Sequence, residues 1–122
     1  MKIAMPVDDK SLNSNVCVSF GRAPYFVIYD TERNSAEFLD NSAISAQGGA
    51  GIRAAQIMVD NGVEAVISVR LGENAADTLS VAEIKLYKSV FGSAQKNIED
   101  FLAGKLNVLT EIHAGFHNHG GR

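Results

Sequence analysis

Residues 2–7 form an almost unbroken apolar run that stops at the paired acids Asp8 and Asp9. A second apolar run, Ala65 to Val69, lies near the middle of the chain. A strand with one solvated face alternates apolar and polar residues, so continuous runs of this length are typical of strands buried on both faces. The two runs therefore predict an α/β fold with buried central strands.

The remaining elements follow from local patterns. Aromatic and β-branched residues predict strands over Tyr25 to Tyr29 and Ala36 to Leu39, joined as an antiparallel hairpin, and a last strand over Ile84 to Tyr87. Residues 41–49 are polar and small, which predicts a mobile loop. Helices are expected over Ala50 to Asn61, over Asn74 to Val81, and from the cap Ser93 to Gly104. The expected apolar faces are Ile52, Ala55, Met58 and Val59 in the first helix, and Ala94, Ile98, Phe101 and Leu102 in the third.

With the strands numbered one to five along the chain, we expect the sheet order 3-2-1-4-5. Right-handed crossovers make strands 1, 4 and 5 parallel, and the hairpin leaves only strand 2 antiparallel. This is a three-layer, ribonuclease H-like arrangement with a five-stranded mixed sheet and three helices. We expect one domain over residues 1–108 and a flexible tail rich in glycine and histidine over residues 109–122.

Composition narrows the class of protein. The formal net charge is -3 and no run of lysine or arginine forms a basic stripe, so nucleic acid is not an expected partner. No stretch reaches the roughly 18 apolar residues of a membrane span. The first strand is too short for a signal peptide, and the one cysteine, Cys17, forms no internal disulfide, so we expect a cytoplasmic protein.

Three glycine-bearing loops should meet at one edge of this sheet. Residues 20–24 follow strand 1, residues 48–51 open the first helix, and residues 70–74 follow strand 4. Ligands of open α/β sheets bind outside the carboxyl ends of the strands. Glycines let the backbone approach a ligand, and helix N-termini together with Arg22, Arg53 and Arg70 favour an anion. The alternative is that residues 48–51 are only a flexible entry to the helix.

Four segments carry a resemblance to a known family. In order and spacing, Met1 to Asp8, Phe20 to Phe26, Gly48 to Gly51 and Gly72 to Ala75 resemble the dinitrogenase iron-molybdenum cofactor biosynthesis family, over Met1 to about Gly104. The resemblance implies a non-enzymatic accessory or carrier protein of nitrogen fixation. Its expected partners are an iron-sulfur or iron-molybdenum cluster, or a related small anionic ligand, and cofactor-assembly proteins. The expected binding residues are Cys17, Ser19, Phe20, Gly21, Arg22, Gly48, Gly49, Gly51, Arg70 and Asn74.

Two groups of side chains are candidate metal ligands. Members of the family typically carry a histidine at the position of Ser19, so a weakly ligating hydroxyl replaces an imidazole here. Cys17 is either a thiolate ligand or a buried small hydrophobe. The spacing of His113, His117 and His119 would suit a divalent metal if the tail became ordered, and the alternative is a disordered tail without metal.

Two other function classes stay open. The same loop edge would suit a regulatory or protein-interaction domain that uses no cofactor. A metal-dependent hydrolase would use Asp8 and Asp9, but no acidic residue ends the apolar run Ala65 to Val69. The chain has no serine elbow, no Walker loop and no complete dinucleotide fingerprint, so an enzyme is the weaker prediction.

Overall fold

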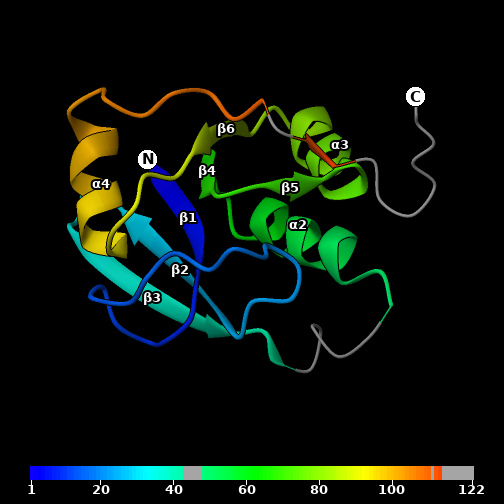
Figure 1. The fold of residues 1–122 in the computed structure, drawn as a ribbon, viewed down its shortest axis with the longest axis horizontal. Helices are drawn as coiled ribbons and strands as arrows, with labels where there is room; N and C mark the ends of the chain where they lie inside the picture. Colours follow the sequence, from blue (N-terminus) through cyan, green and yellow to red (C-terminus); the bar gives the residue numbers. More distant parts are fainter. Residues whose placement is uncertain (43–47, 111, 114–122) are drawn as a thin grey trace.

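The centre of the molecule is a five-stranded sheet of order β3-β2-β1-β4-β6 (Figure 1). The computed structural model describes residues 1–42, 48–110 and 112–113. β2 is antiparallel to β1 and β3, whereas β4 is parallel to β1 and β6. The predicted order and directions are confirmed, with β6 in fifth place because the short strand β5 lies outside this sheet. The strands are β1 (Lys2–Val7), β2 (Tyr25–Asp30), β3 (Ser35–Asp40), β4 (Ala65–Ser68) and β6 (Lys85–Lys88).

Helices cover both faces of the sheet, which gives three layers. Successive side chains of a strand point to opposite faces. Ile3, Met5 and Val7 of β1 therefore pack in the cluster that includes helix α4 (Ala94–Leu102). Ala4 packs in the other cluster, together with α2 (Ala50–Asp60) and α3 (Glu73–Val81). This arrangement confirms the three-layer, ribonuclease H-like prediction, and the described residues form the three expected helices.

The helices begin and end close to the predicted residues, but two of the side chains predicted to form their apolar faces are exposed. Ser93 caps α4, since its Oγ accepts a hydrogen bond from the Lys96 N–H at 3.1 Å. Ile52 is 44% exposed because the sheet side of α2 is formed by smaller residues and Met58. Leu102 is 56% exposed because Phe101 occupies the last turn of α4 against the sheet. None of the helices within the described ranges is long and apolar enough to cross a membrane.

The C-terminal segment packs on the domain further than predicted. Leu109 is buried and its N–H donates to the Leu86 carbonyl at 3.0 Å, because the outer edge of β6 offers unpaired backbone groups. Beyond it, β7 (Ile112–His113) pairs in parallel with β5 (Leu71–Gly72). Residues 109, 110, 112 and 113 therefore have defined positions, and the domain boundary at residue 108 stays a prediction. Residues 114–122 lie outside the described part, and His117 and His119 lie among them.

Candidate functional site

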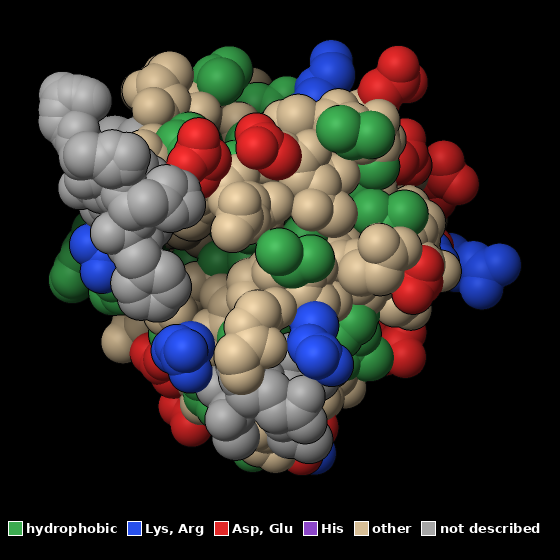
Figure 2. All heavy atoms as spheres, turned by 90° about the vertical axis from the view of Figure 1, so that its right-hand side faces the viewer, with side chains coloured by type: hydrophobic (Ala, Val, Ile, Leu, Met, Phe, Trp, Pro, Cys, Tyr) green, Lys and Arg blue, Asp and Glu red, His purple; other side chains and the backbone are tan. Residues whose placement is uncertain are grey.

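A cavity of about 520 Å³ opens beyond the carboxyl ends of β1 and β4. Figure 2 shows the corresponding hollow, with basic side chains along its lower edge and acidic ones above it. The three loops expected to converge do so here, because the strands that precede them end at this edge. We call this cavity the glycine-rich pocket, and it is lined by Val18 to Arg22, Gly48 to Ile52 and Arg70 to Ala75.

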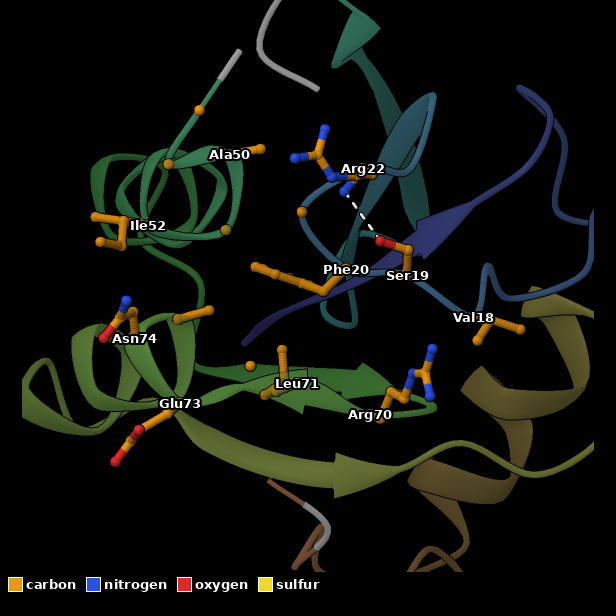
Figure 3. Close-up of a pocket in the computed structure, with 16 residues that line it drawn as sticks. Val18, Ser19, Phe20, Arg22, Ala50, Ile52, Arg70, Leu71, Glu73 and Asn74 are labelled. Atoms are coloured by element: carbon orange, nitrogen blue, oxygen red, sulfur yellow. Dashed lines mark hydrogen bonds between the residues drawn. The ribbon is translucent and has the colours of Figure 1, made fainter. Parts of the chain in front are cut away.

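The floor of the glycine-rich pocket is apolar and its sides are basic. Phe20 and Leu71 are almost completely buried, and their side chains point into the pocket (Figure 3). Phe20 is held from behind by Phe26, with ring centroids 5.1 Å apart. Arg22 and Arg70 lie on opposite sides of this floor, and the side chain of Glu73 is directed away from it (Figure 3). The pocket therefore combines apolar contact with positive charge.

Two helix N-termini open onto the glycine-rich pocket. α2 begins after Gly49 and α3 after Gly72, and neither cap position supplies a side-chain hydrogen bond. The first N–H groups of a helix have no intrahelical acceptor and carry part of the positive end of the helix dipole. Gly49 has a φ of 72°, a left-handed conformation that glycine adopts without strain. These backbone groups are donors that suit an anion.

Close contact between two backbones fixes the shape of the glycine-rich pocket. A Cβ atom on Gly21 would lie 2.7 Å from both Cα and N of Gly51, nearer than side-chain carbons come to backbone atoms. The loop 20–24 can approach the first turn of α2 this closely only because Gly21 has no side chain. Gly21 is thus required by packing, whereas the predicted reason was approach to a ligand.

Two further side chains hold the loop in place. The Ser19 Oγ accepts a hydrogen bond from the Arg22 N–H at 3.1 Å (Figure 3). The Asn41 side chain, which is 1% exposed, donates to the carbonyls of Gly21 and Ala23 at 3.0 and 2.9 Å. Asn41 was expected in a mobile loop, and that expectation is wrong for this residue because its amide replaces water as the partner of loop carbonyls. Residues 43–47 of the same expected loop lie outside the described part.

Cys17 lines a second cavity of about 640 Å³, next to the glycine-rich pocket. The two cavities share Val18 and Ser19, but Cys17 does not line the first. Burial raises the pKa of the Cys17 thiol above its ordinary value; a hydrogen bond from the Ser19 backbone lowers it, and the nearby Asp8 raises it. Cysteine binds iron as a thiolate. Because these surroundings favour the protonated thiol, they disfavour a role for Cys17 as a metal ligand.

The other predicted binding residues all line the glycine-rich pocket, and their role in binding remains a prediction. His113 lies opposite Gly72 in the β5–β7 pair. Of the two acids of the hydrolase hypothesis, Asp8 lines the second cavity and Asp9 is exposed. No group of three or more His, Cys, Asp or Glu side chains able to hold a metal occurs among the residues described.

Residues 1–104 match the family of the dinitrogenase iron-molybdenum cofactor, which is most of the chain. The chain belongs to that family. Membership of the iron-molybdenum cofactor family supports a cofactor-related accessory role and leaves the bound species open. The family match ends before β7, so the β5–β7 pair lies partly outside it.

Relatives of known structure share this fold along nearly their whole length. The apo form of the orange protein from Desulfovibrio gigas has a TM-score of 0.85 and 29% identity, covering 90% of this chain and 93% of that one. A Thermotoga protein, provisionally assigned as a NifB protein, has a TM-score of 0.80 and 37% identity over 98% of both chains. A further relative, matched by sequence, is an uncharacterised protein of Methanocaldococcus jannaschii, which is 32% identical over 87% of this chain and 89% of its own length.

Proposed function

We propose that this member of the iron-molybdenum cofactor family is a non-enzymatic carrier that holds an anionic metal-sulfur species in the glycine-rich pocket. The cargo would be an iron-sulfur or iron-molybdenum cluster, or a precursor of one. One observation carries the proposal, namely that two uncapped helix N-termini and the side chains of Arg22 and Arg70 surround one apolar floor. Family membership supports the same cargo class.

The chemistry of the lining suits a cargo that already has its own inorganic ligands. The lining residues within the described ranges include no cysteine and no histidine, and the hydroxyl of Ser19 accepts a backbone hydrogen bond. The pocket therefore offers charge, N–H donors and apolar contact, but no soft donor to the metal itself. Guanidinium groups are weakly hydrated, and with the apolar floor they favour a polarisable sulfide anion over a strongly hydrated oxyanion.

Anaerobic titration of the full chain with tetrathiomolybdate tests the proposal. This dianion carries molybdenum with a complete sulfide shell, and its visible absorption and equilibrium dialysis report binding. We expect saturable binding that weakens with added salt, because part of the attraction is between charges in water. Molybdate, which has the same charge but oxygen ligands, should bind more weakly because it gains less from the apolar floor.

Arginine variants locate the binding site. Arg22→Ala and Arg70→Ala should each weaken binding roughly tenfold, about 1.4 kcal/mol. Arg53→Ala is the matched control, because Arg53 is an exposed arginine in α2 close to the pocket but does not line it. If all three variants bind tetrathiomolybdate as tightly as the unaltered protein, the pocket does not hold the anion and the proposal fails.

A further inference from the structure

Asn41 makes three hydrogen bonds to the loop that carries Arg22, although it does not line the glycine-rich pocket. Its backbone N–H donates to the Pro24 carbonyl at 2.9 Å. Its side-chain amide donates to the carbonyls of Gly21 and Ala23 at 3.0 and 2.9 Å. Both donors of the amide are thus used on the residues immediately before and after Arg22.

The acceptor half of the same amide is not used in the described structure. The Asn41 Oδ1 atom is buried and has no hydrogen-bond partner among the described residues. A buried acceptor without a partner destabilises a fold, and such groups are uncommon in native proteins. The two N–H donors of the Asn41 amide therefore favour asparagine at this position, whereas its unpaired oxygen disfavours it. Both donors bond to the loop that carries Arg22.

These hydrogen bonds restrict the direction in which Arg22 leaves the backbone. A peptide group is planar, so holding the Gly21 carbonyl also holds the Arg22 N–H. That N–H donates to the Ser19 Oγ (Figure 3). The Ala23 carbonyl is held on the other side of Arg22, and the Gly21 backbone lies against Gly51. Without the Asn41 amide, the buried Ala23 carbonyl and the part-buried Gly21 carbonyl would lose this partner, and the loop could change conformation.

We propose that Asn41 is a positioning residue of the glycine-rich pocket, which fixes the backbone around Arg22 so that the guanidinium faces the bound anion. The inference rests on the proposed function, because it assigns Asn41 an effect on the anion that Arg22 contacts. It predicts that removing the Asn41 donors weakens binding through Arg22, beyond any loss of stability.

The chain supplies a matched control in Asn97. This second buried asparagine is 0% exposed, and its amide donates to the carbonyls of Val90 and Ser93, in and beside the loop at the second cavity. Asn41→Leu and Asn97→Leu each replace an amide by an apolar side chain of similar size. Both should lower the thermal midpoint. Only Asn41→Leu should weaken tetrathiomolybdate binding, by about as much as the roughly tenfold loss expected for Arg22→Ala.

A double variant separates positioning from general damage. If Asn41 acts through Arg22, the protein with both Asn41→Leu and Arg22→Ala should bind within about twofold of Arg22→Ala alone, since coupled residues are not additive. A loss of about a hundredfold, the product of the single effects, would overturn the inference. The milder Asn41→Ser keeps one donor and should give an intermediate loss, and it serves as the test if Asn41→Leu does not fold.

The two proposals fail in different ways. Unaltered affinity in the Arg22→Ala protein would overturn the proposed function and, with it, the role of Asn41. The positioning role alone would be overturned if Arg22→Ala weakens binding while the Asn41→Leu and Asn41→Ser proteins are folded and bind with unaltered affinity. Equal weakening by Asn41→Leu and Asn97→Leu would also overturn it, because the effect would then follow stability and not the loop.

Discussion

Replacing Gly21 by alanine should destabilise the protein through one backbone contact. The added Cβ would lie 2.7 Å from Cα and N of Gly51 and 3.1 Å from the carbonyl carbon of Ala50. Because carbon atoms pack best at about 3.5 Å or more, the loop and α2 would have to separate by roughly 0.8 Å. Overpacking of this kind costs about 1–3 kcal/mol. For a chain of this size the melting temperature should fall by about 4–12 °C.

Gly51→Ala is the matched control, because it adds the same methyl group on the other side of the contact. There the new Cβ would meet only the Ala75 Cβ, at an ordinary 3.6 Å. Alanine is also the better helix former, so the stability of this variant should be unchanged or higher by up to about 1 kcal/mol. Thermal unfolding followed by circular dichroism measures the melting temperatures of both variants. Equal melting temperatures for Gly21→Ala and the unaltered protein would refute the packing argument.

Three further predictions concern separate parts of the chain. Ser93→Ala removes the α4 cap and should lower the free energy of unfolding in urea by about 1 kcal/mol; an unchanged urea midpoint would contradict a capping role. Since burial and Asp8 raise the pKa of the Cys17 thiol, iodoacetamide should alkylate Cys17 more slowly than glutathione at pH 8, and Asp8→Asn should speed the reaction. An unchanged or slower rate in Asp8→Asn would contradict this effect of the carboxylate on the thiol. Backbone N–H groups of the following turn lower the pKa of Asp30 below 3.8, so its stabilising effect is present above about pH 4 and is lost as pH falls through the lower folded-state pKa. An NMR titration should find Asp30 protonating at lower pH than an aspartate in a short unstructured peptide, and an equal or higher pKa would be inconsistent with these hydrogen bonds.

The sheet and the place of the pocket were predictable from sequence because they depend on patterns along the chain. The apolar run of β1 and the hairpin after Pro24 determine the order of the sheet, and the handedness of crossovers supplies the directions. The glycine-bearing loops then had to share one edge. The three loops meet as expected. Residues 20–24 and 70–74 come after strands that end at this edge, and residues 48–51 open the helix that begins there.

The parts that sequence did not reveal depend on contacts between distant residues. The Asn41 side chain donates hydrogen bonds to Ala23 and Gly21, which lie 18 and 20 positions earlier in the sequence. Nothing in the polar stretch after β3 distinguishes Asn41 from its neighbours. The pairing of β5 with β7 joins residues about forty positions apart in two strands too short to show a period. Cys17 has the right position in sequence for a ligand, but the chain turns at Val18, so the thiol lines the neighbouring cavity.

The contact between Gly21 and Gly51 also has a consequence for how such proteins diversify. Because the Gly21 and Gly51 backbones touch directly, no side chain lies between the loop and α2 at this point. Substitutions at Arg22 or Arg70 can then change the charge of the pocket while this contact between the loop and α2 stays the same. If the pocket holds the proposed anion, its selectivity can therefore change one residue at a time while the two backbones keep their contact.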